Sequence, residues 1–367
     1  MKRHYIIPIF VPHRGCPHDC IFCNQRRITG RRESTDEREI QGIIEKYLAT
    51  FPPEAEIHKE IAFYGGSFTG IPLGEQKNLL EIARQYKARG LVNGIRISTR
   101  PDYISREILN FLHHQGVTVI ELGVQSLDDE VLEKSRRGHA SRDVFTASRM
   151  IRQFSFQLGL QMMVGLPGDT REKAVATAQK IAGLQPDFVR IYPTVVLEGT
   201  LLAALYREGS YQPLSLAEAV DQAAMALLIF TGAGIPVIRV GLQPSEELYA
   251  KEGIIAGPAH PAFRELAESR IAYFMMCCLL NQLPAPPHRV EFLVHPRWLS
   301  AALGNKRANI INLSSEYGVD SMRICGHEAV DRGDIKLHSA DNQTRELYLS
   351  KKTFAARVAG MFGSPHE

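Results

Sequence analysis

Short apolar runs alternate with longer amphipathic stretches over the first two thirds of this 367-residue chain. A short apolar run bounded by turn residues predicts a buried strand, and apolar positions three or four residues apart predict a helix. The predicted strands are Tyr5–Val11, Glu60–Tyr64, Gly94–Thr99, Val117–Gly123, Leu158–Val164 and Asp187–Tyr192. The predicted helices are Asp36–Leu48, Leu73–Arg89, Ser105–Gln115, Arg142–Phe154 and Arg171–Leu184.

This alternation predicts an α/β fold with a parallel sheet covered by helices, because neighbouring parallel strands need a crossover connection. An open doubly wound sheet and a partial barrel both fit the order of the elements. In both architectures, chemistry gathers at the carboxyl ends of the strands. The loops that follow the predicted strands are therefore where we expect a functional site.

The loop after the first predicted strand carries three cysteines, Cys16, Cys20 and Cys23. Clustered thiolates select zinc or iron–sulfur. Structural zinc usually takes four protein ligands in two pairs, and no second pair follows here, since the next cysteines are Cys277 and Cys278. Three thiolates can hold three irons of a 4Fe–4S cluster and leave the fourth iron open to a small molecule.

This cysteine spacing resembles the three-cysteine motif of the radical S-adenosylmethionine (radical SAM) superfamily. The resemblance implies that S-adenosylmethionine chelates the open iron and that the reduced cluster cleaves it to methionine and a 5′-deoxyadenosyl radical. It also implies a partial (β/α)6 barrel, and an electron donor such as a flavodoxin or ferredoxin. Phe22 occupies the aromatic position that usually packs near the adenine, although an aromatic residue here could equally fill a core.

Further motifs follow the other predicted strands. Paired glycines in GGSFTGIP let the backbone approach a ligand closely, and they match the family's glycine motif. In STRPDYI, Ser98 stands where relatives often carry a glutamate that touches the ligand. The resemblance assigns S-adenosylmethionine binding to Phe22, Gly65, Gly66, Ser67, Ser98, Glu121, Gln125, Arg137, Gly165 and Pro167.

The motifs ELGVQS, RRGH and MMVGLPGDT complete this series. Glu121 and Gln125 are polar positions in an apolar run, a pattern typical of a strand end that faces a polar site. Arg137 can form a bidentate pair with the carboxylate of the ligand, although a surface arginine is the commoner case. Gly165 and Pro167 belong to a turn suited to backbone contacts with an adenine or ribose.

Together the motifs closely resemble the radical SAM half of the Elongator catalytic subunit, from about residue 5 to about residue 242. They are more distantly similar to oxygen-independent coproporphyrinogen oxidase. The first resemblance implies an RNA-modifying enzyme that acts on transfer RNA, and the second implies an enzyme for a small metabolite. A cluster kept for structure or sensing is a third hypothesis. After residue 245 no basic-glycine loop for acetyl-CoA is found, so acetyl-CoA-dependent carboxymethylation is not expected.

The remaining residues predict a helical connector, residues 246–284, between a barrel, residues 1–245, and a small α/β domain, residues 285–367. The order of strand, helix, basic glycine loop, helix and strand in the last domain resembles a KH nucleic-acid-binding domain. Lys306, Arg307 and Arg323 would supply contacts to RNA phosphates, although Arg307 replaces the second glycine of the KH loop. A generic α/β appendage is the alternative.

Composition adds limits on localisation and partners. Hydrophobic residues make up 44% and charged residues 23%, as in ordinary globular proteins, and the formal net charge is +3. No apolar run is long enough to span a bilayer, and the amino terminus lacks a secretion signal. We therefore expect a cytoplasmic protein with no membrane contact; the oligomeric state cannot be predicted.

Overall fold

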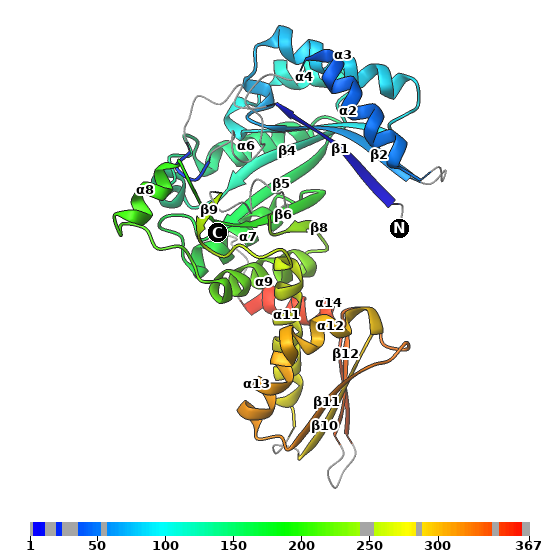
Figure 1. The fold of residues 1–367 in the computed structure, drawn as a ribbon, viewed down its shortest axis with the longest axis vertical. Coiled ribbons are helices and arrows are strands. Elements are labelled where there is room, and N and C mark those ends of the chain that lie inside the picture. The colour runs from blue at the N-terminus through cyan, green and yellow to red at the C-terminus, as the bar shows by residue number, and fades with distance from the viewer. Residues whose placement is uncertain are drawn as a thin grey trace.

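The computed structural model of this chain contains two main sheets, which lie at opposite ends of a set of packed helices (Figure 1). The residues that it describes are 3–11, 20–23, 36–52, 57–242, 253–283, 288–339 and 345–361. Cys16, one of the three predicted cluster ligands, lies outside the described residues.

The first sheet has seven parallel strands in the order β1-β2-β3-β4-β5-β6-β8 and curls into part of a barrel, with helices outside (Figure 1). The strands are β1 (Arg3–Val11), β2 (Ile57–Gly65), β3 (Gly94–Thr99), β4 (Val119–Gln125), β5 (Gln157–Val164), β6 (Phe188–Pro193) and β8 (Val237–Val240). The helices are α2 (Glu37–Thr50), α3 (Leu73–Ala88), α4 (Arg106–His114), α5 (Asp129–Lys134), α6 (Ser141–Arg152), α7 (Arg171–Gly183), α8 (Leu201–Arg207) and α9 (Leu216–Gly232).

Side-chain oxygens fix where several of these helices begin. Asp36, Ser105, Thr170 and Ser215 each accept a hydrogen bond from the backbone N–H group three residues further on. Such an N-cap contributes about 1 kcal/mol, because it satisfies a donor that the helix itself leaves unpaired. These helix starts are therefore encoded locally.

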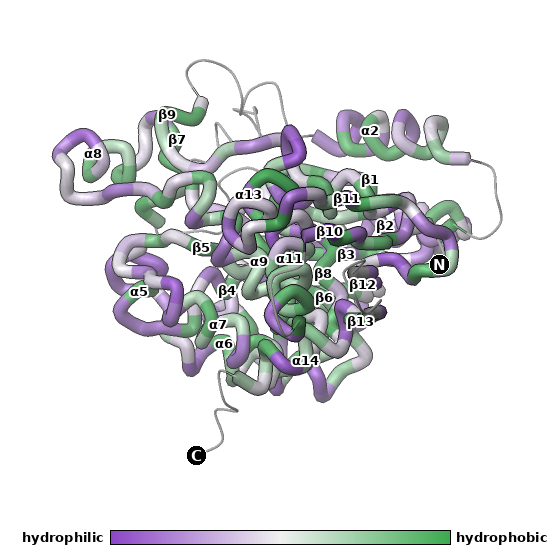
Figure 2. Tube along the Cα trace, turned by 90° about the horizontal axis from the view of Figure 1, so that it is seen from below, coloured by the Kyte–Doolittle hydropathy of each residue, from purple (hydrophilic) through white to green (hydrophobic). Residues whose placement is uncertain are grey.

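Alternate residues of the strands face two environments. In β3, Ile95 and Ile97 are fully buried in the main hydrophobic core, whereas Arg96 between them is buried on the inner face of the barrel. Seen from below, hydrophobic segments gather in the centre of the molecule around β3, β6 and α9, while α5 at the rim is largely hydrophilic (Figure 2). The barrel therefore has an apolar outer wall beneath the helices and a polar interior.

The predicted parallel α/β sheet, curled as a partial barrel, is confirmed, and the sheet has one strand more than predicted. The bounds of β3 match the prediction, and the other five predicted strands are shifted by one to three residues at their ends. The additional strand, β8, has only four residues and is partly exposed, so its apolar run is too short to stand out. Helix α9, which precedes it, is buried on most sides and shows little amphipathic periodicity.

The second sheet has four strands in the order β11-β10-β12-β13. Its elements are β10 (Arg289–Val294), α12 (Leu299–Leu303), α13 (Ala308–Tyr317), β11 (Ser321–Gly326), β12 (Ile335–Ser339), β13 (Arg345–Leu349) and α14 (Lys351–Met361). The predicted order of strand, two helices and strand is present, with β10 and β11 side by side and parallel. The KH-like character of this region stays a prediction.

Two helices join the sheets. Helix α11 (Phe263–Leu280), which lies within the predicted helical connector, packs against α9 on one side and α12 and α13 on the other. Helix α14 also packs against α9, where a Cβ atom on Gly232 would come within 2.9 Å of the backbone oxygen of Ala355. The predicted C-terminal domain therefore returns to the barrel through its last helix.

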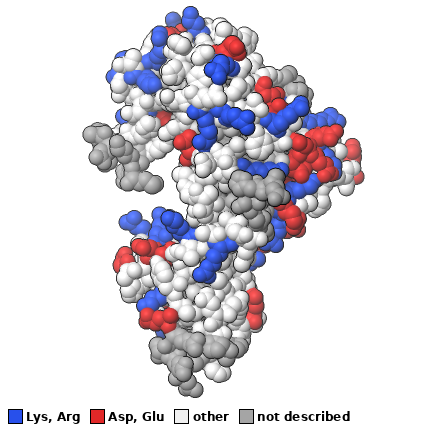
Figure 3. Space-filling model, turned by 180° about the vertical axis from the view of Figure 1, so that it is seen from behind, with Lys and Arg blue, Asp and Glu red and all other residues white. Residues whose placement is uncertain are grey.

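Among the described residues, no helix is both long and apolar enough to cross a bilayer. On the face seen from behind, Lys and Arg side chains are interspersed with Asp and Glu side chains over both parts of the molecule (Figure 3). This mixture agrees with the small net charge.

Candidate active site at the carboxyl ends of the strands

The described part of the cysteine loop is held against α5 and α8. The backbone N–H of Ile21 donates to the carbonyl oxygen of Ser135, and the N–H of Leu202 donates to the carbonyl oxygen of Ile21. Ile21 is buried in a small apolar cluster, and Phe22 packs against that cluster. Cys20, with only 4% of its surface exposed, is therefore held in place through Ile21, which is hydrogen-bonded to both helices.

Arg137 links the cysteine loop to the end of β4. One of its terminal nitrogens donates to the sulfur of Cys20 at 3.3 Å, and the other donates to the carbonyl oxygen of Gly123 at 2.6 Å. The side chain is buried, and its Nε atom has no hydrogen-bond partner among the described residues. Gly123 leaves the necessary room, since a Cβ atom there would lie 2.7 Å from the guanidinium.

Gln125 ends β4 in a strained backbone conformation, with a φ angle of 67°. The pairing between β4 and β5 shifts register between Gly123 and Gln125. Gln125 is buried, and its Oε1 atom has no hydrogen-bond partner within the described part of the chain. This acceptor therefore lies open beside Arg137, whereas buried polar atoms usually have a hydrogen-bond partner.

The glycine pair at the end of β2 lies beside the end of β1. Gly65 has a φ angle of 105°, and a Cβ atom there would lie 2.6 Å from the carbonyl oxygen of Val11. The N–H of Gly66 donates to that same oxygen. Ser67 is buried, and its hydroxyl group lies 2.8 Å from the hydroxyl group of Thr99. The glycines thus contact β1, the strand that precedes the cysteine loop. The hydroxyl contact of Ser67 with Thr99 holds this turn against the end of β3.

The turn after β5 is braced from two sides. The N–H of Gly165 donates to the carboxylate of Asp169 at 2.9 Å, and the hydroxyl of Tyr211 donates to the carbonyl oxygen of Gly165 at 2.6 Å. Burial raises the pKa of Asp169 to about 6, against the lowering effect of its backbone hydrogen bonds. Pro167, in the middle of this turn, is half-buried.

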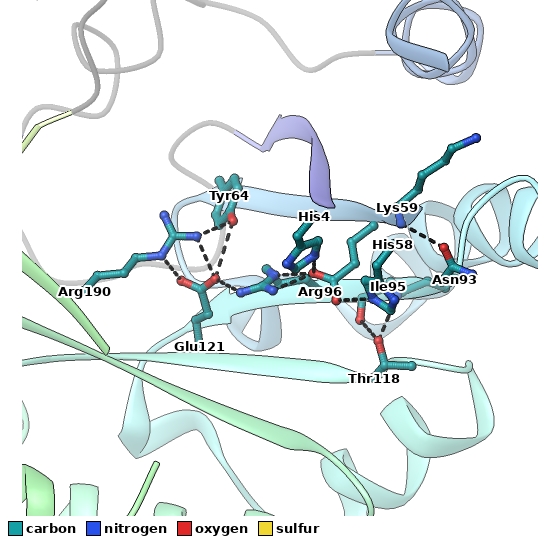
Figure 4. A network of polar contacts seen from close by, with 11 residues as sticks. His4, His58, Lys59, Tyr64, Asn93, Ile95, Arg96, Thr118, Glu121 and Arg190 are labelled. Carbon is teal, nitrogen blue, oxygen red and sulfur yellow. Dashed lines mark hydrogen bonds and ion pairs between the residues drawn. The ribbon is translucent and has the colours of Figure 1, made fainter. Parts of the chain in front are cut away.

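Below this edge, charged side chains fill the interior of the barrel (Figure 4). Arg96 contacts Glu60 through two nitrogens, at 2.8 and 2.5 Å, and Glu121 through the third, at 2.5 Å. Arg190 forms an ion pair with Glu121 at 2.9 Å and donates to the hydroxyl of Tyr64 at 2.7 Å. The two carboxylates neutralise the two guanidinium groups. This pairing offsets the free energy that it costs to remove these charges from water.

Three of these buried charges, Glu60, Arg96 and Arg190, were missed by sequence reasoning. The strands that carry them were predicted from their apolar residues alone. Polar residues alternate with these apolar ones, and this alternation was the available signal for a polar inner face. By the same alternation, Ser98 faces the barrel interior two residues beyond Arg96. Glu121 lies four residues before Gln125, about 13 Å from the strand end, and both of its carboxylate oxygens are engaged by arginines.

Thr194 is a further residue at the site edge to which the sequence analysis gave no role. It follows β6, and its N–H donates to the carbonyl oxygen of Val164 at the end of β5. Its hydroxyl oxygen is buried without a hydrogen-bond partner among the described residues. Like Gln125, it offers an open polar atom at the carboxyl ends of the strands.

The basic residues of the C-terminal region lie on two different surfaces. Lys306 and Arg307 are exposed in the loop between α12 and α13, both with left-handed backbone angles. Asn309 holds this loop by donating to the carbonyl oxygens of Ala302 and Ser269. Arg323 is exposed on β11 and alternates with buried Ile324, so it lies on the face of the sheet away from the helices.

Comparison with known proteins places this geometry in a family. The family model of the radical SAM superfamily matches residues 10–181, and that of the radical SAM C-terminal domain matches residues 186–273. The solved structure of an N-terminally truncated Elp3 from the archaeon Methanocaldococcus infernus is similar, with a TM-score of 0.58 and 22% identity. The similarity covers 74% of this chain and 63% of the Elp3 chain.

Two curated relatives illustrate the sequence similarity. A tRNA uridine(34) acetyltransferase of Methanocaldococcus infernus is 27% identical over 255 residues, which cover 59% of this chain and 48% of the relative. Elongator complex protein 3 of Homo sapiens is 27% identical over 304 residues, which cover 71% of this chain and 54% of the relative. The chain thus spans about half the length of these relatives. The two family matches and the site at the strand ends agree: this chain belongs to the radical SAM superfamily of enzymes.

Proposed function

We propose that this chain is a radical SAM enzyme that modifies transfer RNA. The observation that carries the first half of the proposal is the contact between Arg137 and Cys20, next to the open acceptor of Gln125. A buried guanidinium nitrogen and a buried amide oxygen, both without partners among the described residues, suit a ligand with a carboxylate and an ammonium group.

The donor set fits the cofactors that the family implies. Cys20 and Cys23 come from one short loop, in which the N–H of Cys23 donates to the carbonyl oxygen of Cys20. We assign the cluster to these two thiolates and to Cys16. When bound, a 4Fe–4S cluster supplies the electron that cleaves S-adenosylmethionine to methionine and a 5′-deoxyadenosyl radical.

The chain's own residues would bind and orient S-adenosylmethionine. The turn at Gly65 and Gly66 would face it at the end of β1. Gly65 packs so closely against Val11 there that a side chain would collide with the Val11 backbone. Arg137 and Gln125 would face its methionyl group, and the braced turn at Gly165 would face its adenosyl group. Beneath the site, the side chains of Arg96, Glu121 and Arg190 are buried in ion pairs, so this layer keeps water out of the barrel interior.

Transfer RNA is the proposed substrate because relatives over this part of the chain are named tRNA uridine(34) acetyltransferases. The exposed loop with Lys306 and Arg307 supports an RNA partner, since two adjacent cations on a fixed loop can contact successive phosphates. Acetyl transfer is not part of the proposal.

Iron and sulfide analysis tests the cofactor assignment. The reconstituted protein should bind about four irons per chain. Replacing Cys16, Cys20 or Cys23 singly with alanine should lower the iron content and abolish cleavage of S-adenosylmethionine. Cys325→Ala is the matched control, because Cys325 lies on the second sheet and contacts Glu291. Equal iron loss in all four variants would contradict the assignment.

A further inference from the structure

Two histidines and a glutamate meet at the amino-terminal end of the barrel, opposite the cysteine loop. His4 on β1 pairs in register with His58 on β2, and Glu60 follows two residues later on the same face of β2. The cysteine loop follows the other end of β1. His4 therefore lies about 23 Å along β1 from its end at Val11, and Glu60, which pairs with Ile6, lies about 17 Å from it. The three side chains are thus outside the proposed active site.

Both imidazoles point their Nε2 atoms at the same carboxylate (Figure 4). His4 Nε2 lies 3.0 Å from one oxygen of Glu60, and His58 Nε2 lies 3.0 Å from the other. All three ligand atoms fall within 4.8 Å of one another. Around a tetrahedral zinc ion with bonds near 2.0 Å, ligand atoms are about 3.3 Å apart, so small side-chain movements would admit an ion.

We propose that His4, His58 and Glu60 form a binding site for a divalent transition-metal ion, for which zinc is the best fit. Two imidazole nitrogens and a carboxylate oxygen are a donor set that zinc takes in proteins, with water in the remaining position. The histidine side chains are 40% and 42% exposed, which leaves access for the ion and for water.

Arg96 prepares the carboxylate for this role. It donates two hydrogen bonds to Oε2 of Glu60 and so fixes the orientation of the side chain, while Oε1 contacts only His58 among the described residues. The charge of Arg96 is shared with Glu121, which reduces its repulsion of a cation.

A bound metal ion would hold β1, the strand that precedes the cysteine loop, against β2. Among the described strands, β1 is at the edge of the sheet and pairs only with β2. An ion held by His4 from β1 and by His58 and Glu60 from β2 would cross-link the two strands. By linkage it would stabilise the folded chain in proportion to the logarithm of the metal concentration.

The test measures zinc bound to the untagged full chain, with the iron–sulfur cluster reconstituted under anaerobic conditions. The wild-type chain should bind one zinc ion per chain beyond its iron, and Zn K-edge absorption should show only nitrogen and oxygen ligands near 2.0 Å. His4→Ala and His58→Ala should each weaken zinc binding by more than about 10-fold, the lower end of what loss of a supporting residue costs. Zinc should raise the unfolding temperature of the wild-type chain but not of these variants.

The double variant His113→Ala/His114→Ala is the matched control, because these histidines on α4 also adjoin each other but have no carboxylate partner among the described residues. It should bind zinc like the wild type. His4→Gln, which keeps a donor for Glu60, separates loss of the ligand from loss of folding. Sulfur ligands near 2.3 Å, zinc binding unchanged by the His4 and His58 substitutions, or no zinc binding would each overturn the proposal.

Discussion

One terminal nitrogen of Arg137 lies 3.3 Å from the sulfur of Cys20, and the other terminal nitrogen lies 2.6 Å from the carbonyl oxygen of Gly123. One side chain thus fixes the cysteine loop relative to the end of β4. These two segments are more than 100 residues apart in the sequence, and Arg137 reaches both because α5 ends just before it.

Arg137→Lys should lower 5′-deoxyadenosine formation by about 10- to 100-fold, the usual cost of losing a residue that supports a metal ligand. A lysine keeps the charge, but its single nitrogen cannot span Cys20 and Gly123. Product formed from S-adenosylmethionine and dithionite is the measurement. Arg136→Lys is the control, since Arg136 is exposed. Equal activity of the two variants would show that the bridge has no role.

Gly65→Ala should destabilise the protein and impair cofactor binding, because the new Cβ would lie 2.6 Å from the oxygen of Val11 and the backbone φ of 105° is strained for alanine. Urea unfolding should show a loss of more than about 1 kcal/mol. Gly42→Ala in α2 is the matched control, because a Cβ there meets no atom within 4 Å. Alanine in that helix should raise stability by about 0.5–1 kcal/mol. Similar effects at both positions would contradict this account.

Glu121→Gln should cost about 3–5 kcal/mol of folding free energy, since it leaves two buried guanidinium groups, those of Arg96 and Arg190, without their shared partner. The measurement is the urea midpoint. Glu81→Gln removes an exposed partner of Arg84 on α3 and should leave that midpoint nearly unchanged. A stable Glu121→Gln variant would mean that the ion network does not maintain the barrel interior.

His139 should make the folded state sensitive to mild acid. Burial, with the charges of Arg137 and Arg100, lowers the pKa of His139 from 6.5 to about 3. Below pH 6.5, the imidazole of His139 therefore binds a proton in the unfolded chain but stays neutral in the folded chain. The stability contributed by the neutral imidazole is fully present above pH 6.5 and is lost as pH falls toward 3.

Between pH 6.5 and 5, the unfolding free energy of the wild type should fall more steeply than that of His139→Gln, by a difference in slope that approaches about 1.4 kcal/mol per pH unit near pH 5. Urea titrations at fixed pH values measure this slope. His114→Gln, at an exposed histidine, should keep the wild-type slope. The same slope in His139→Gln and the wild type would assign the acid sensitivity to another group.

Lys306→Ala/Arg307→Ala should weaken transfer RNA binding and reduce its dependence on salt. Each lost phosphate contact should lower the slope of log K against log salt by about 1. Lys77→Ala/Arg142→Ala, with the same charge change on α3 and α6, is the control. An unchanged slope in the loop variant would remove the C-terminal loop from the proposed RNA interface.

The sequence predicts well what is encoded locally. β3 has the predicted bounds because Gly94 and Pro101 enclose its apolar run. Helix starts at Asp36 and Ser105 follow from side chains that cap the next turn. The order of these elements, with short connections, then leaves a parallel sheet as the natural arrangement.

Contacts between distant strands could not be predicted in the same way. The pairing of Arg96 with Glu60 and Glu121 depends on register across three strands, which no local pattern fixes. The residues of the cysteine and glycine motifs were found because their spacing is specific. Arg190 and His58 belong to no motif, and only the folded structure brings them to their partners.

The central claim is tested most directly by anaerobic cleavage of S-adenosylmethionine, with and without bulk transfer RNA. The reconstituted chain, reduced with dithionite, should form 5′-deoxyadenosine at a rate that rises when transfer RNA is added, and Cys20→Ala should form none. A cleavage rate that does not change with transfer RNA would contradict the proposal that transfer RNA is the substrate and would favour a small metabolite. If the chain with a fully loaded cluster cleaves no S-adenosylmethionine under either condition, the proposed enzymatic activity is wrong.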